Sequence, residues 1–230
     1  MNIKSFYRGI LTNKKSILRA CIVSLFLRSH TKIVIASVGR SGSSVLTRQI
    51  ADAYFLKYLP KYLHPFRSLL VPFMWEFCNY LDQVSFFSGP IIKTHDQYSA
   101  LLMMDFPVKF IFIYCDPLES ALSVSRQRYF EGDKWVALHI DHLRGKGSPE
   151  HIFYRDALNF ENQILAWLES PALFIKYPDF WKQHDRISNF LNIDVKLPIY
   201  KERVFDDSLL PVDYNFQMFE DLRRLLNCLE

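Results

Sequence analysis

The sequence has few cysteines and few glycines, and its first fifty residues contain no acidic side chain. Of its 230 residues half are hydrophobic, and the only four cysteines are widely spaced and form no C-x-x-C pair. This spacing favours neither a zinc site nor a disulfide framework and fits a reducing compartment, so we expect a cytoplasmic protein. The length and apolar content are typical of one domain that buries its core without covalent cross-links. We therefore expect a single domain over residues 1–230.

The lack of acidic residues before Asp52 leaves the N-terminal part strongly basic. This charge distribution favours an anionic partner near that end. Residues 16–28 carry apolar side chains at helical spacing, but the run is interrupted by Arg19 and is too short for a transmembrane span. We expect residues 1–30 to form a basic helical segment that packs beside the first strand. A membrane-surface helix and a targeting segment are the alternatives.

Two of the seven glycines, Gly39 and Gly42, lie in a single turn. Residues 32–46 read KIVIASVGRSGSSVL, which is a hydrophobic strand, a hydroxyl-rich turn and a helix-like run. Backbone N–H groups of such a turn converge at the helix N-terminus, where the helix dipole adds partial positive charge. The turn is therefore predicted to hold an anion. A plain strand-to-helix connection also favours Gly and Ser, but it does not require Arg40 in its middle.

The turn lacks the lysine of a Walker A loop. That loop reads G-x-x-x-x-G-K-[ST], whereas Ser43 follows Gly42 in this chain. Ordinary ATP or GTP hydrolysis is therefore disfavoured.

Three further apolar runs, at residues 90–93, 108–114 and 172–177, predict buried strands. Their apolarity is continuous rather than alternating, which is typical of parallel strands covered on both faces. Helices are predicted at residues 43–57, 117–130, 154–168 and 179–191. The alternation predicts an α/β fold with a central parallel sheet flanked by helices. In such sheets, ligands bind beyond the carboxyl ends of the strands.

Charged and hydroxyl side chains follow two of these strands. Lys93 and His95 follow the second strand, and histidine suits general-base chemistry near neutral pH. Ser123 and Arg126 lie three residues apart on the helix after the third strand, so they share a face and can contact one anion together. A histidine that caps a loop and an arginine in a solvated surface are the simpler alternatives. The neighbouring lysine and the glycine turn favour a functional role.

Four separated segments resemble the sulfotransferases that use 3′-phosphoadenosine 5′-phosphosulfate (PAPS). Arg40-Ser41-Gly42-Ser43-Ser44 matches the loop that holds the 5′-phosphosulfate in that family. Residues 115–123 follow the spacing of the segment that holds the 3′-phosphate. Lys93-Thr94-His95 matches the Lys-Thr-His of cytosolic members, and residues 174–180 are similar to the late strand whose tyrosine lies near the adenine.

This resemblance implies a fold, a co-substrate and a set of roles. The fold would be a P-loop NTPase-like three-layer sandwich, and PAPS would donate a sulfuryl group to a hydroxyl or amine without a metal. His95 would be the catalytic base, while Lys93 and Arg40 would stabilise the transferring group. The implied cofactor-binding residues are Arg40, Ser41, Gly42, Ser43, Ser44, Ser123, Arg126 and Tyr177.

Cys115 departs from the family pattern, which usually has an arginine here on the 3′-phosphate. One charge-assisted contact of about 1.5–3 kcal/mol is missing as a result, and Arg126 or Arg128 would have to replace it. This departure keeps open a non-catalytic nucleotide-binding protein on a sulfotransferase scaffold. An atypical P-loop kinase is the other alternative. The expected partner is a small-molecule or glycan acceptor, with no nucleic acid.

The acceptor side of the site is less well defined by the sequence. Residues 54–87 are rich in aromatics and prolines, and residues 131–150 are predicted to form a long loop that acts as a lid or substrate wall. His139 and His142 lie in that predicted loop. They have no supporting ligand motif, so no metal site is expected.

Overall fold

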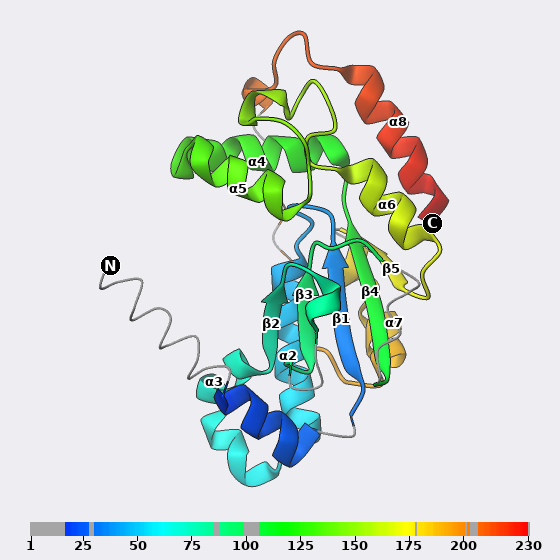
Figure 1. Cartoon of the computed structure of the whole chain (residues 1–230). Helices are drawn as coiled ribbons and strands as arrows, with labels where there is room; N and C mark the ends of the chain where they lie inside the picture. The colour runs from blue at the N-terminus through cyan, green and yellow to red at the C-terminus, as the bar shows by residue number, and fades with distance from the viewer. Residues whose placement is uncertain are drawn as a thin grey trace, which may run out of the picture.

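The protein has an α/β fold built on a five-stranded sheet whose strands are all parallel. The computed structural model describes residues 17–27, 30–84, 88–98, 106–177, 179–200, 202 and 207–229. The strands lie in the order β2-β3-β1-β4-β5 (Figure 1), which confirms the expected central parallel sheet. Their bounds are β1 (Lys32–Ser37), β2 (Trp75–Cys78), β3 (Ile91–Thr94), β4 (Val108–Tyr114) and β5 (Leu173–Lys176).

Helices flank the sheet on both faces and cover the carboxyl ends of its strands. In Figure 1, α2 and α7 lie behind the sheet, and α4 and α5 lie above the strand ends. The α-helices are α2 (Ser43–Tyr58), α3 (Arg67–Leu70), α4 (Pro117–Glu131), α5 (Asp133–His142), α6 (Phe160–Leu168), α7 (His184–Leu191) and α8 (Phe216–Leu226). The shorter helical segments are η1 (Val23–Leu27), η2 (Lys61–Phe66), η3 (Val71–Phe73), η4 (Leu81–Gln83), η5 (Pro149–His151), η6 (Asp179–Trp181), η7 (Asp207–Leu209) and η8 (Asn227–Leu229).

The register of the sheet brings the ends of the three central strands to one level. Ile35 of β1 pairs with Lys93 of β3 on one side and with Ile111 of β4 on the other. The residues that follow these strands therefore meet at the same edge, as the sequence predicts. β4 has the bounds expected from its apolar run, and β1, β3, β5, α2 and α4 agree with expectation to within about one residue.

Strand β2 and two helix boundaries differ from expectation. β2 is a four-residue edge strand with partly exposed side chains, so it has no continuous apolar run. Helix α6 begins at Phe160 rather than at Tyr154: its N-cap is Asn159, in the left-handed conformation, and the Asp156 carboxylate before it accepts bonds from the free amides of Phe160 (2.8 Å) and Glu161 (2.9 Å). Helix α7 begins at His184, after the short segment η6.

The described part of the basic N-terminal segment packs on the body of the protein. Residues 17–22 are helical and continue into η1. Arg19 forms an ion pair with Glu76 and donates to the carbonyl of Trp75 (3.3 Å), so the neighbour of the segment is the edge strand β2 rather than β1. Residues 1–16 and 28–29 lie outside the described residues. Every helix in the described ranges is too short or too polar to span a lipid bilayer.

Trp167 of α6 anchors the front face of the sheet. Its ring is fully buried and stacks on Phe112 of β4, with a centroid distance of 5.4 Å and an interplanar angle of 16°. Its indole N–H donates to the carbonyl of Asp96 at 3.0 Å. The same side chain therefore fills the core and satisfies a buried carbonyl in the loop that follows β3.

Replacing Trp167 tests this anchoring role. We expect Trp167→Phe to lower the free energy of unfolding by about 2–4 kcal/mol, because it removes buried volume and leaves the Asp96 carbonyl without its donor. Trp181 is the matched control, since it is only partly buried and its N–H donates to the exposed carbonyl of Pro198. Trp181→Phe should cost about 1 kcal/mol or less. Urea unfolding followed by circular dichroism measures both; equal losses would contradict the assignment.

Candidate functional site

The turn between β1 and α2 has the backbone shape of an anion cradle. Arg40 (φ 62°) and Gly42 (φ 79°) both adopt the left-handed conformation, and Gly42 is the N-cap of α2. With no side chain at the N-cap, the first amide groups of the helix point into the turn. The Tyr177 ring closes one side, since a Cβ on Gly42 would lie 2.7 Å from its Cδ2 atom.

The serine hydroxyls of the turn form hydrogen bonds to other groups of the protein. Ser41 donates to the carbonyl of Val38 (2.9 Å), and the Ser43 hydroxyl lies 2.9 Å from the Ser37 hydroxyl. Both Ser41 and Ser43 are buried. Ser44 is exposed and accepts a bond from Lys93 Nζ at 2.7 Å. The amides of the turn, rather than the hydroxyls of Ser41 and Ser43, are therefore the candidate donors to an anion in this conformation.

Two cations reach the turn from different elements. Arg40 Nε donates to Ser123 Oγ of α4 at 3.0 Å, so the structure joins residues 40–44 to the predicted segment of residues 115–123. Lys93 comes from β3, and its bond to Ser44 joins the Lys93-Thr94-His95 segment to the same turn. Burial lowers the pKa of Lys93 to about 8, and the nearby charges of Arg40 and Arg48 add to the effect. A bound anion would favour the charged ammonium.

His95 is buried at the end of β3 with one nitrogen committed to the backbone. Its Nδ1 lies 2.8 Å from the carbonyl of Ser37, which assigns the proton to Nδ1 and the lone pair to Nε2. Burial lowers the pKa of His95 to about 4, although the bond to Ser37 opposes this shift. The ring is therefore neutral at neutral pH, in the form that accepts a proton.

Residues 131–150 contain a helix, so the prediction of a long loop is wrong in its secondary structure. Val136, Ile140 and Leu143 are buried at helical spacing on one face of α5 and the turn after it, and this i, i+4, i+7 pattern was the available sequence signal. The Leu143 carbonyl accepts from Asn159 Nδ2 at 2.9 Å and from Gln163 Nε2 at 3.2 Å. The segment is thus anchored to α6; its contribution to ligand binding stays a prediction.

Helix α5 brings two rings beside the turn: Trp135, which sequence reasoning missed, and His139, which it considered only as a metal ligand. Trp135 stacks on His139 with a centroid distance of 4.9 Å and an interplanar angle of 13°, and the Arg40 guanidinium lies 5.9 Å from the Trp135 ring centre. A Cβ on Gly39 would lie 2.9 Å from His139 Nε2. That buried nitrogen has no hydrogen-bond partner among the described residues. An unpaired buried polar atom beside the cradle is a group available to a ligand.

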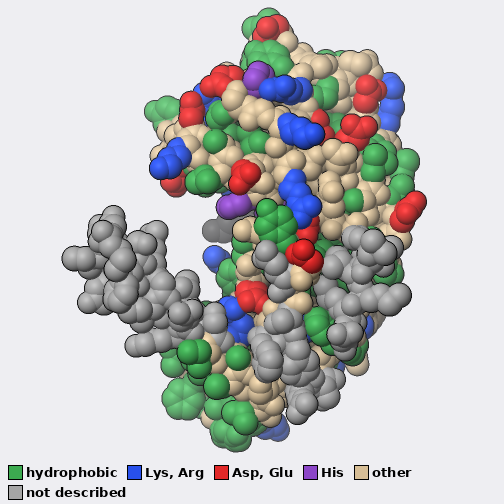
Figure 2. All heavy atoms as spheres, in the orientation of Figure 1, with side chains coloured by type: hydrophobic (Ala, Val, Ile, Leu, Met, Phe, Trp, Pro, Cys, Tyr) green, Lys and Arg blue, Asp and Glu red, His purple; other side chains and the backbone are tan. Residues whose placement is uncertain are grey.

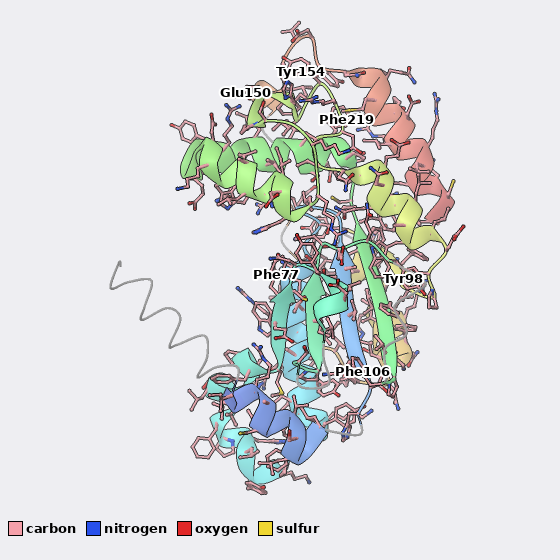
Figure 3. All side chains as sticks on the ribbon, in the orientation of Figure 1. Phe77, Tyr98, Phe106, Glu150, Tyr154 and Phe219 are labelled. Atoms are coloured by element: carbon pink, nitrogen blue, oxygen red, sulfur yellow. The ribbon has the colours of Figure 1, made fainter. Side chains whose placement is uncertain are left out.

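Two imidazoles contact an aromatic ring on the β2 side of the site, and a third lies beside one of them. Phe77 stands at the upper end of β2 (Figure 3), with its ring centre 5.7 Å from His95 and 5.8 Å from His142. The rings of His95 and His139 lie 6.2 Å apart. Burial, together with the charges of His95 and Arg40, lowers the pKa of His139 to about 3. Within the described ranges no three His, Cys, Asp or Glu side chains form a metal-ligand set.

The β4 side of the site contains an arginine from the far end of the sequence. Cys115 is buried, with its sulfur 3.8 Å from the carbonyl of Gly39. The next residue, Asp116, caps α4 through the Leu118 amide and accepts bonds from Arg223 of α8 at 2.6 and 3.1 Å. No local pattern signals Arg223, because 107 residues separate it from Asp116. It brings a guanidinium next to Cys115, the position at which the family that the sequence resembles usually has an arginine.

The remaining predicted residues differ in how close they lie to the turn. Arg126 is exposed on α4 and makes no hydrogen bond to the turn within the described ranges, whereas Arg128 pairs with Asp133 and, at 3.6 Å, with Glu150. Tyr177 is buried against Gly42.

In Figure 2 the surface is hollowed on the left below α5, where a histidine and Lys or Arg side chains reach the surface.

The lowered histidine pKa values predict a pH-dependent stability. Between pH 6.5 and about 4 the unfolded chain binds more protons than the folded one, because the folded pKa values of His95 and His139 lie near 4 and 3. The free energy of unfolding should therefore fall as the pH drops from 7.5 to 5.5. In His139→Gln the decrease in the free energy of unfolding should be smaller than in the wild type. His184→Gln, at a partly exposed site on α7, should show the same decrease as the wild type. Urea unfolding at both pH values measures it, and an unchanged fall in His139→Gln would reject the idea.

Comparison with known proteins adds no assignment to this geometry. No protein-family model matches the sequence, and no curated protein matches it either. A function for this chain is therefore argued from its own residues: a left-handed turn at a helix N-terminus, two cations that reach it, and a neutral histidine beside it.

Proposed function

We propose that the protein is a PAPS-dependent sulfotransferase with a P-loop NTPase-like three-layer fold. The observation that carries the proposal is the 3.0 Å bond between Arg40 and Ser123. It joins the segment that resembles the family's 5′-phosphosulfate loop to the segment that resembles its 3′-phosphate site. A nucleotide with phosphates at both positions needs these two segments at the same edge of the sheet. The acceptor in this proposal is a small molecule or a glycan.

The charges around the turn suit the transfer of a sulfuryl group. The acceptor oxygen bonds to sulfur while the bond from sulfur to the bridging oxygen breaks, which leaves a sulfate ester and adenosine 3′,5′-bisphosphate. Negative charge spreads over the peripheral and bridging oxygens, and fixed cations and amides stabilise such charge. The amides of α2, the guanidinium of Arg40 and the ammonium of Lys93 are the donors at this position.

His95 takes the proton of the acceptor in this scheme. Its Nδ1–H is held by the Ser37 carbonyl, so Nε2 is the atom that receives the proton. With a pKa of about 4 the ring is a weak base in the ligand-free protein. An anion bound in the adjacent turn stabilises the imidazolium and raises this pKa toward the working range. Base strength thus increases when the donor is bound.

Ligand-induced stabilisation tests the nucleotide assignment. Adenosine 3′,5′-bisphosphate at 100 times its Kd should stabilise the fold by about 2.7 kcal/mol, which raises Tm by roughly 5–10 °C for a chain of this size. ATP with magnesium should have a much smaller effect. Arg40→Ala should abolish the shift because it removes the guanidinium from the turn, whereas Arg186→Ala, on the exposed face of α7, should preserve it. A shift with ATP–magnesium alone would favour a kinase and reject the proposal.

His95→Asn separates binding from chemistry. Its amide can still donate to the Ser37 carbonyl, but no basic nitrogen replaces Nε2. We expect a normal shift with the bisphosphate and a loss of sulfuryl transfer to any acceptor of at least about a hundredfold. Normal turnover in this variant would exclude His95 as the base. A wild type that binds the bisphosphate but transfers to no acceptor would support the non-catalytic alternative.

Arg126 and Arg128 differ in their availability to a 3′-phosphate. Arg128 is committed to Asp133 and Glu150, whereas Arg126 is exposed three residues after Ser123 on the same helix face. Arg126→Ala should therefore weaken binding of the bisphosphate by about tenfold, and Arg128→Ala by less than about threefold. Isothermal titration calorimetry measures both affinities. Equal affinities for the two variants would contradict the assignment of Arg126.

A further inference from the structure

A cleft of about 750 Å³ lies along the outer face of α2, next to the candidate site. Its walls come from α2, from the segment that contains α3 and η3, and from the first residue of β2. A cleft of this volume is of the size that holds a small organic ligand. The wall residues that matter for the argument are Arg48, Asp52, Arg67, Val71, Pro72 and Trp75.

The cleft adjoins the cation at the proposed point of transfer. Arg48 lies one helical turn after Ser44 on α2, so the two side chains share a face. Ser44 accepts the bond from Lys93 Nζ, and the charge of Arg48 contributes to the lowered pKa of Lys93. Arg48 is therefore the cleft residue on the same face of α2 as Ser44, the hydrogen-bond partner of Lys93.

The positive and negative charges that line the cleft do not cancel. Arg67 forms a two-pronged ion pair with the Asp52 carboxylate, so each neutralises the other. Arg48 is exposed, and among the described residues no carboxylate lies within ion-pair distance of it. The cleft thus has one uncompensated positive charge, and that charge lies at the end nearest the candidate site.

Most of the opposite wall is apolar. Val71, Pro72 and Trp75 offer aliphatic surface and an aromatic ring to a ligand, and Ser68 and the ion-paired Arg67 are the polar residues of the same segment. The burial of an apolar ligand body against this wall contributes about 25 cal/mol of favourable binding free energy per Å² of buried surface. An anionic group on the same ligand pairs with the guanidinium of Arg48. The lining therefore matches an amphiphilic anion rather than a neutral polyol.

We propose that this cleft binds the acceptor, and that the acceptor is an anionic molecule with an apolar body. Its negative group contacts Arg48, its body packs on Val71 and Trp75, and its hydroxyl extends toward Lys93 and His95. The term acceptor rests on the sulfotransferase function proposed above. The binding chemistry of the cleft does not depend on that function, so the two can be tested separately.

Two fluorescent probes of nearly equal shape test the charge requirement. The anionic probe is 8-anilinonaphthalene-1-sulfonate and the uncharged one is N-phenyl-1-naphthylamine. Arg48→Gln should weaken binding of the anionic probe by about tenfold, the effect of one charge-assisted contact, and should change binding of the uncharged probe by less than about twofold. Arg186→Gln is the matched control, because Arg186 is exposed on α7 and bonds only to Gln183 among the contacts described; it should affect neither probe.

The position of the probe is tested by energy transfer and by competition. Trp75 lines the cleft, so Trp75→Phe should reduce the tryptophan-sensitised emission of the bound anionic probe more than Trp181→Phe does. Saturating adenosine 3′,5′-bisphosphate should change the affinity of the probe by less than about twofold. Displacement by the bisphosphate, or equal affinity for the anionic probe in Arg48→Gln and wild type, would overturn the proposal.

The outcomes also separate this inference from the proposed function. A protein that binds the anionic probe through Arg48 but shows no response to the bisphosphate would reject the sulfotransferase function and retain the anion-binding cleft. A protein that responds to the bisphosphate but binds the probe independently of Arg48 would reject the cleft alone.

Discussion

The candidate site depends on a backbone constraint in the turn between β1 and α2. Arg40 and Gly42 both hold positive φ angles, and this path turns the chain from the strand into the helix with the first amides of α2 facing the turn. A non-glycine residue in this conformation costs about 1–2 kcal/mol. The surrounding bonds hold it in place: Ser41 to Val38 within the turn and Arg40 to Ser123 across to α4. The strain is thus located at the point where an anion would bind.

Burial around this turn disfavours the protonated forms of its basic groups: it keeps His95 and His139 neutral and brings the pKa of Lys93 close to neutral pH. The pKa values of His95, His139 and Lys93 are all lowered, mainly by desolvation. Positive charges on all three groups would repel one another, and the lowered pKa values relieve that repulsion. An anion bound in the turn would stabilise each protonated form. Binding of the proposed ligand would therefore be coupled to proton uptake.

Much of the fold and part of the site were predictable from local sequence patterns. Continuous apolar runs revealed β1, β3, β4 and β5, since buried parallel strands have a signature within a few residues. β2 was missed because a short edge strand has no such run. The bond between Arg40 and Ser123 agrees with the predicted grouping. Arg223 could not be predicted, because its partner Asp116 is brought close only by tertiary packing.

The anchoring of α5 has a consequence for selectivity. The carbonyl of Leu143 is held by two side chains of the α6 region, and Arg144 forms an ion pair with Asp96 at 2.5 Å. For a ligand that contacts α5, as the sequence predicts, the ordering entropy of this segment is already lost during folding and does not oppose binding. A segment fixed in this way would discriminate by shape: larger ligands would overlap with it sterically, and smaller ones would leave apolar surface in contact with water.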